Sequence, residues 1–209
     1  SVVFGGFGAA ALADRIELAD AELLVTADVG YRNGDEVDLK AIVDRTVDEY
    51  DAAGDRIEDV VVLQRGDDTA LHERDTAWNE AIERGQGEDT SHVETAATDP
   101  AFILPTSGTT GKPKGTVHQH GGYQVHVYAM AQWMFDLDPA DTWFATSDIG
   151  WIVGHSYIVY APLLVGCTTV VYEGVPTYPD AGVWWDIVER HGVTEIFTAP
   201  TAIRARRRS

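Results

Sequence analysis

A stretch rich in glycine and hydroxyl side chains, Thr106 to Gly115 (TSGTTGKPKG), is the part of the sequence best suited to chemistry. Its glycines allow positive φ angles, so the backbone can bring its N–H groups close to a ligand and form an anion-binding concavity. Hydroxyl and ammonium side chains add donors that suit phosphate. The donors are Thr106, Ser107, Thr109, Thr110, Lys112 and Lys114, and the glycines are Gly108, Gly111 and Gly115. No carboxylate interrupts the stretch, although the chain has 34 acidic residues, so we predict a polyphosphate-binding loop.

This stretch is not a Walker A loop. That motif has four residues between its first glycine and its Gly-Lys pair, whereas Gly108 and Gly111 are separated by two. Pro113 follows Lys112 and disfavours helix there, so no helix should begin at the lysine. A plain surface turn rich in Gly, Ser, Thr and Pro is the alternative interpretation.

A second glycine pattern lies near the start of the chain. Gly6-x-Gly8-x-x-Ala11 stands between an expected strand and an expected helix, and Asp28 closes the following strand. This is close to the dinucleotide-binding fingerprint, with the acidic residue at a suitable distance. A Rossmann-type NAD-binding domain is therefore an alternative hypothesis.

The elements that would position these residues alternate along the chain. Apolar runs and helical periodicity predict strands and helices in turn, which is typical of an α/β fold with a mostly parallel sheet. The expected strands are 1–4, 22–26, 59–63, 101–104, 142–145, 168–172 and 195–198; the expected helices are 9–18, 39–50, 76–84, 122–135 and 184–190. The phosphate loop would leave the end of the strand 101–104.

Composition narrows the class of protein. The net charge is −19, and only three of the fifteen basic residues are lysines. Such a surface opposes nucleic-acid or anionic-membrane binding and suits a halophile. A single cysteine, Cys167, excludes a disulfide framework and fits a reducing cytoplasm. Residues 149–172 carry no formal charge, but Gly and Pro interrupt them, so we expect a buried helix and strand rather than a membrane span.

Several stretches together resemble one family. The strings SVVFGGFGAAALADRI, HQHGGY, SDIGWIVGHSYIVYAPLLVG, EGVPTYP and TAPTAIRA, with the loop TSGTTGKPKG, are similar to the AMP-forming acetyl-CoA synthetases of the adenylate-forming superfamily. The resemblance runs from Ser1 to about Ala205. It implies that ATP with Mg²⁺ and coenzyme A (CoA) are substrates beside acetate or a similar short acid, and that no prosthetic group is bound. His118 and His120 lack further ligands at zinc spacing, so we expect no protein-bound metal.

The resemblance also implies roles for particular residues. Residues Thr106 to Lys112, with Lys114, would hold the phosphates of ATP. Trp151, Ile152 and Val153 would shape the pocket for the acid, and Val153 would also contact CoA. The remaining expected CoA contacts are Arg32, Asn33, Gly34, Asp35 and Thr177.

The sequence departs from the family pattern at four positions. The family usually has Tyr in place of Pro105 and a basic residue in place of Asp35. It often has Thr in place of Val153 and Asn in place of Thr177. The family's Gly-Glu-Pro and Tyr-Gly-x-Thr-Glu motifs do not occur. We therefore expect residues 1–209 to be part of the large N-terminal domain, without its upstream part, its adenine site or the C-terminal domain. This part should be inactive alone, and the missing remainder is its expected partner. A non-catalytic remnant or a broken-gene segment that binds nucleotide weakly is the alternative.

Overall fold

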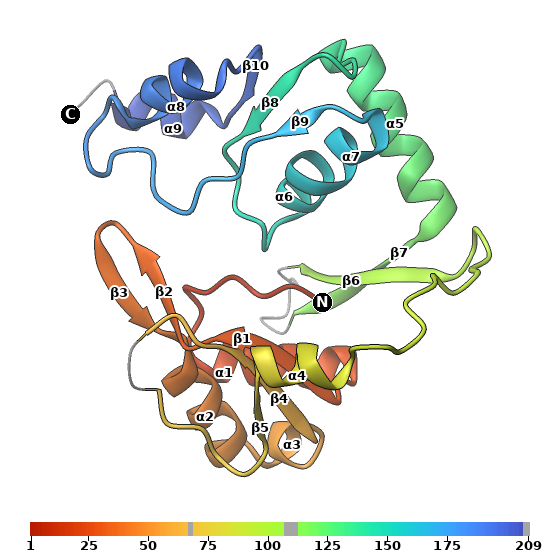
Figure 1. Ribbon diagram of the computed structural model, residues 1–209, viewed down its shortest axis with the longest axis vertical. Helices are drawn as coiled ribbons and strands as arrows, with labels where there is room; N and C mark the ends of the chain where they lie inside the picture. The colour runs from red at the N-terminus through yellow and green to blue at the C-terminus, as the bar shows by residue number, and fades with distance from the viewer. Residues whose placement is uncertain (67–68, 107–112, 207–209) are drawn as a thin grey trace.

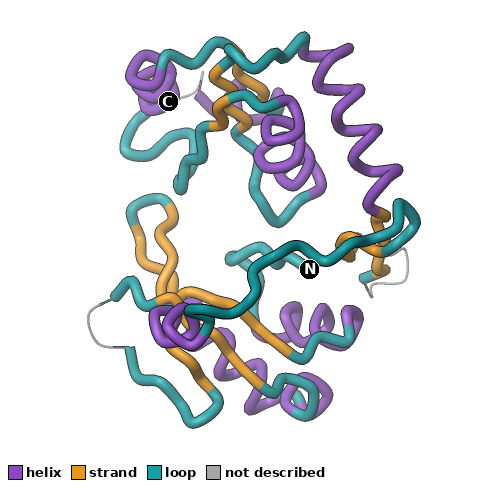
Figure 2. The backbone as a smooth tube through the Cα atoms, turned by 45° about the vertical axis from the view of Figure 1, so that its right-hand side comes forward, coloured by secondary structure: helices purple, strands orange, loops and turns teal. Residues whose placement is uncertain are grey.

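The computed structural model describes residues 1–66, 69–106 and 113–206, except the side chains at 51–52 and 205–206. Its elements form two groups, each around a small parallel sheet, and Figure 1 shows them one above the other. The chain passes from the lower group to the upper through β6 (Pro100–Thr106), β7 (Lys114–Gln119) and α5 (His120–Phe135). In Figure 2 this long helix runs along the side of the upper group.

The lower group has the sheet order β1-β4-β5, with all pairs parallel. Buried valines of the central strand, Val60 and Val62, pack against Ile16 of α1 and Val43 of α2. Its strands are β1 (Leu23–Ala27), β4 (Asp59–Leu63) and β5 (Asp75–Ala77), and its helices are α1 (Ala9–Ala19), α2 (Leu39–Glu49), α3 (Asp51–Gly54) and α4 (Trp78–Arg84).

The upper group has the parallel order β10-β8-β9. Trp143 of β8 is buried in its core together with Val127 and Ala131 of α5. The strands are β8 (Thr142–Ala145), β9 (Thr168–Thr169) and β10 (Glu195–Phe197); the helical segments are α6 (Ile152–Gly154), the π-helical η1 (His155–Tyr160), α7 (Ala161–Val165), α8 (Val183–His191) and α9 (Pro200–Arg206). The expected α/β class with parallel sheets is confirmed.

Two antiparallel ribbons complete the fold. β2 (Val29–Arg32) and β3 (Asp35–Asp38) form a hairpin that rises from the lower group toward the upper one, as Figure 1 shows. β6 and β7 pair from Thr106↔Lys114 to Pro100↔Gln119. The phosphate stretch is therefore the connection of a two-stranded ribbon, and the second strand of that ribbon was not predicted.

Two strands that the sequence predicted differ from the structure. Residues 1–4 form no strand, because Phe4 packs edge-on against Phe7 and beneath the Arg32 guanidinium instead of joining the edge of a sheet. The expected strand 168–172 is only Thr168–Thr169. Within the described ranges, no helix has the length and apolarity that crossing a bilayer requires; the uncharged run 149–172 contains α6, η1, α7 and β9.

The carboxylate of Asp28 organises the junction between β1, β4 and the hairpin. Its side chain is 1% exposed, and it accepts hydrogen bonds from the backbone N–H groups of Val29, Arg65 and Gly66 at 2.7, 2.8 and 3.0 Å. The Thr69 hydroxyl donates a fourth bond. Burial alone would raise the pKa of this carboxyl, but the four donors outweigh burial and lower the pKa to about 2.

We expect Asp28→Asn to destabilise the chain at neutral pH. An amide cannot accept all four bonds, so buried donors would lose their partner, at a cost of about 2 kcal/mol. Because the folded-state pKa lies below that of the unfolded chain, the stabilisation is present above pH ~4 and disappears as the pH falls toward 2. Urea unfolding at several pH values measures this difference. A gap between wild type and variant that stays constant from pH 7 to pH 3 would contradict the assignment.

Candidate functional site

The ends of the phosphate loop are held by the ribbon β6–β7. Thr106 pairs with Lys114, and its hydroxyl donates to the Lys114 carbonyl at 3.2 Å. Both residues are exposed. The predicted donors between them, Ser107, Gly108, Thr109, Thr110, Gly111 and Lys112, lie outside the described residues.

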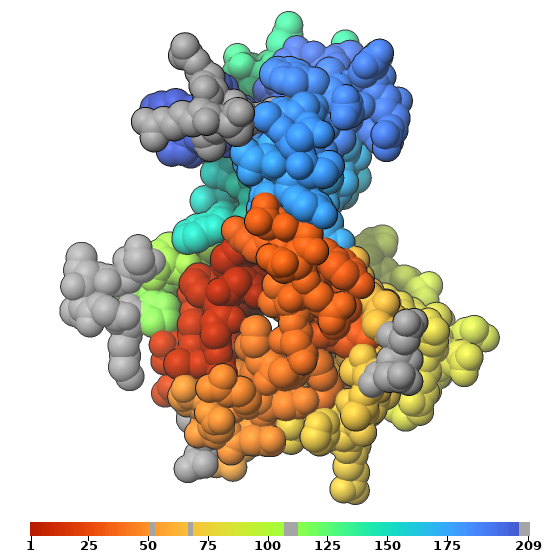
Figure 3. All heavy atoms as spheres, turned by 90° about the vertical axis from the view of Figure 1, so that its left-hand side faces the viewer, coloured from red at the N-terminus to blue at the C-terminus, as the bar shows by residue number. Residues whose placement is uncertain are grey.

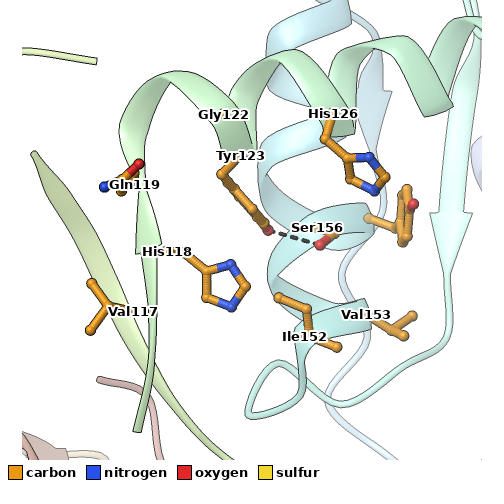
Figure 4. Close-up of a pocket in the computed structure, with 10 residues that line it drawn as sticks. Val117, His118, Gln119, Gly122, Tyr123, His126, Ile152, Val153 and Ser156 are labelled. Carbon is orange, nitrogen blue, oxygen red and sulfur yellow. Dashed lines mark hydrogen bonds between the residues drawn. The ribbon is translucent and has the colours of Figure 1, made fainter. Parts of the chain in front are cut away.

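A cavity of about 460 Å³ opens near the other end of the same ribbon. It lies between the last residues of β7, the first turns of α5, and the segment α6–η1, as Figure 4 shows. Two regions far apart in the sequence, 117–126 and 152–157, therefore contribute its walls. The lining residues are Val117, His118, Gln119, Gly122, Tyr123, His126, Ile152, Val153, Ser156 and Tyr157.

A buried hydrogen bond joins two walls of this cavity. The hydroxyl oxygens of Tyr123 on α5 and Ser156 on η1 are 2.8 Å apart. Burial raises the pKa of the Tyr123 phenol, more than the bond with Ser156 lowers it. The phenol is therefore neutral at physiological pH, and the cavity presents hydroxyl groups rather than a negative charge.

A stack of rings includes His118, which lines the cavity. Phe102 of β6 stacks on His118, with centroids 4.6 Å apart, and on His155 of η1 at 5.1 Å. Burial, followed by the charge of His155, lowers the pKa of the His118 imidazole. The cavity wall combines apolar side chains with hydroxyl groups, which suits a small and partly apolar group.

The three residues expected to shape the acid pocket have different positions. Ile152 and Val153 line the cavity. Trp151 is not among the lining residues; its side chain is 55% exposed, while its carbonyl accepts from the backbone N–H of His155 at 3.0 Å. His155 is buried, and its Nδ1 lies 3.0 Å from the same carbonyl.

Four of the expected CoA contacts, Arg32 to Asp35, lie away from this cavity at the tip of the β2–β3 hairpin, whereas Val153 lines the cavity itself. Asn33 and Gly34 have φ angles of 55° and 85°, and Arg32 pairs with Asp35 across the turn. Such positive angles favour an Asn-Gly sequence. All four residues are exposed.

The structure brings this turn beside the segment that contains Thr177. A Cβ atom on Gly34 would lie 2.5 Å from Cζ of Tyr178, so the tyrosine ring covers the turn where glycine leaves room. In the space-filling view of Figure 3, the orange hairpin meets the blue upper segment. Two groups of expected CoA residues, distant in sequence, are therefore neighbours in space.

Two charged residues that the sequence analysis missed link the same segments. The Arg65 guanidinium donates to both carboxylate oxygens of Glu173, each at 2.8 Å. Glu173 is the first formal charge after the uncharged run 149–172, a signal that could have drawn attention to it. Arg65 follows β4 without any comparable sequence signal.

The NAD-binding alternative lacks its structural context. That fingerprint requires a strand directly before the glycines, and residues 1–4 form none. The carboxylate of Asp28 is also occupied by its four donors rather than free for a ribose. Across the described parts of the chain, no group of three or more His, Cys, Asp or Glu side chains is placed to hold a metal ion.

Comparison with known proteins identifies the family. The family model described as "AMP-binding enzyme" matches residues 1–208. Acetyl-coenzyme A synthetase of Rubrobacter xylanophilus is 49% identical over 207 residues, 98% of this chain and 31% of the relative. Its counterpart from Pyrobaculum aerophilum is 47% identical over 98% of this chain and 30% of the relative.

A solved structure agrees with this result. Acetoacetyl-CoA synthetase from Streptomyces lividans superposes with a TM-score of 0.82 at 27% identity, covering 97% of this chain and 30% of that one. The chain thus spans about a third of the length of the proteins it matches. From the family match along nearly its whole length, this chain belongs to the AMP-binding enzymes.

Proposed function

We propose that this chain forms part of an AMP-forming acetyl-CoA synthetase. The observation that carries the proposal is the ribbon β6–β7, which connects the phosphate loop to the cavity. Lys114 and Val117 are three residues apart on β7, or about 10 Å along a strand. A carboxylate in the cavity would therefore lie near the phosphates of ATP.

The reaction has two steps. A carboxylate oxygen attacks the α-phosphorus of ATP, and pyrophosphate leaves with its Mg²⁺. The thiolate of CoA then attacks the acyl carbon of the acyl-AMP and displaces AMP. Catalysis of this kind depends on positioning and on donors that neutralise phosphate charge.

The described residues have distinct parts in this proposal. Ile152 and Val153 limit the length of the acid at the cavity wall, and Thr106 and Lys114 anchor the loop that grips the pyrophosphate. Trp151 supports this wall through its carbonyl rather than by contact with the acid. The turn Arg32–Asp35, with Thr177, meets the phosphates of CoA.

We expect the 209-residue chain alone to form no acetyl-CoA. A productive site also needs an adenine pocket and groups that orient the α-phosphate, and positioned groups contribute about 7–11 kcal/mol to lowering a barrier. Acetate-dependent pyrophosphate release is measured with the chain alone and with the complementary part of an acetyl-CoA synthetase relative added. Activity that appears only in the mixture supports the proposal. Turnover by the chain alone would contradict it, and no turnover in the mixture would favour a non-catalytic remnant.

We expect Asp35→Lys to strengthen the contact with CoA. Asp35 places a negative charge on an exposed turn beside the polyanion, and a charge pair 4 Å apart in water is worth about 1 kcal/mol. Removing this repulsion and adding an attraction of the same size, about 2 kcal/mol in all, should tighten binding about thirtyfold at low salt and less at high salt. NMR titration of the chain with CoA measures this effect.

Glu58→Lys is the matched control for Asp35→Lys. It makes the same charge change at an exposed residue that precedes β4, at the end of the strand opposite Arg65. Equal tightening by both variants would show that net charge, rather than the turn, attracts CoA.

We also propose that the protein works in concentrated salt, in a reducing cytoplasm that suits its buried free Cys167. With a net charge of −19, self-repulsion should fall as the Debye length shrinks from about 10 Å at 0.1 M to about 3 Å at 1 M. The melting temperature should therefore rise with potassium chloride. A melting temperature that does not depend on salt would argue for a non-halophilic protein.

A further inference from the structure

The pair Arg65–Glu173 joins two parts of the chain that the CoA proposal needs together. Arg65 follows β4 in the lower group, and Glu173 follows β9 in the upper group. The side chains are 31% and 51% exposed, and the two parallel bonds match the planar guanidinium to the carboxylate. Arg65 is the leading cause of the lowered pKa of the Glu173 carboxyl.

The same carboxylate also holds the hairpin. Oε1 of Glu173 accepts from the backbone N–H of Tyr31 at 3.4 Å, and the Arg65 guanidinium lies 5.0 Å from the centroid of the Tyr31 ring. Tyr31 directly precedes Arg32, the first residue of the expected CoA turn. The ion pair thus contacts the strand that carries the turn.

Both partners are themselves fixed by neighbouring contacts. The backbone N–H of Arg65 donates to the Asp28 carboxylate at 2.8 Å. This bond fixes the backbone from which the arginine side chain extends. Next to Glu173, the hydroxyl of Tyr172 donates to the carbonyl of Tyr178 at 2.9 Å and closes the loop from Tyr172 to Tyr178. Tyr178 in turn covers Gly34. These contacts connect the ion pair to the turn from both sides.

We propose that Arg65 and Glu173 are positioning residues for CoA: their ion pair holds the Arg32–Asp35 turn against the Thr177 segment, so that both meet the nucleotide end of CoA. This inference rests on the proposed function, because it takes the turn to be a CoA contact. It adds two residues that touch no substrate and act through the turn. Arg65→Lys would keep the positive charge but lose the bidentate hydrogen bonding to the carboxylate.

The test is a double-mutant cycle on the 209-residue chain with Arg65→Lys, Glu173→Gln and the combined variant. NMR provides two readouts: amide exchange along the hairpin, including the Tyr31 N–H, and titration with CoA followed at the Asn33 and Gly34 amides. Adenosine 3′,5′-bisphosphate is titrated in parallel, to separate the nucleotide end from the rest of CoA. Arg56→Lys is the control, because it alters an ion pair with Asp20 that involves neither the hairpin nor Glu173.

Each single variant should speed hairpin exchange and weaken binding of both ligands about threefold to fivefold, the range expected for a partly exposed ion pair. The combined variant should be no worse than the weaker-binding single variant, because both changes break one interaction. Arg56→Lys should change neither readout.

Two results would overturn the inference, and they differ from each other. If wild-type amides at the turn do not respond to CoA, the proposed CoA contact is wrong and the positioning role falls with it. If wild type responds but the variants bind CoA as tightly, the CoA contact stands and the ion pair does not position it. In the second case, faster amide exchange in the variants would show that the Arg65–Glu173 pair stabilises the hairpin without affecting CoA binding.

Discussion

The hydrogen bonds to the buried carboxylate of Asp28 are the constraint on which the site depends most. One side chain collects backbone donors from the start of β2 and from the loop after β4. Its own backbone also accepts from the Lys40 N–H and donates to the Leu63 carbonyl, so the strand ends and the start of α2 meet at one residue. A buried ionised group is costly unless its bonds are complete, which ties the geometry of the hairpin to that of the sheet.

The sequence predicted the fold best where short apolar runs are buried. The expected bounds of β4 and β8 agree with the structure, because β-branched and aromatic side chains pack well in buried strands. β7 escaped prediction because Lys114–Gln119 is polar and largely exposed, and it is defined by its partner β6 rather than by a pattern of its own. The strand predicted at residues 1–4 is wrong although the run is apolar, because Phe4 contacts the Phe7 ring and the Arg32 guanidinium instead of pairing with a strand.

For the site, local motifs were readable and long-range contacts were not. Ile152 and Val153 do line a cavity, and the Asn-Gly turn adopts positive φ angles; their chemical roles stay predictions. The opposing wall, with His118 and Tyr123, comes from the strand and helix after the loop, and their alignment requires the folded ribbon. No sequence pattern joins Arg65 to Glu173, because ion pairs across a chain depend on topology rather than spacing.

The two groups of elements are joined by contacts of different physical character. On one side, Phe102 packs its ring against His155 and Tyr160 in a largely buried stack; on the other, the Arg65–Glu173 pair is partly open to water. Dissolved ions screen the second contact and leave the first nearly unchanged. Salt should therefore weaken the contact at the hairpin more than the aromatic contact beside the cavity. The hairpin should then be held less firmly at high ionic strength, while the aromatic packing beside the cavity is retained.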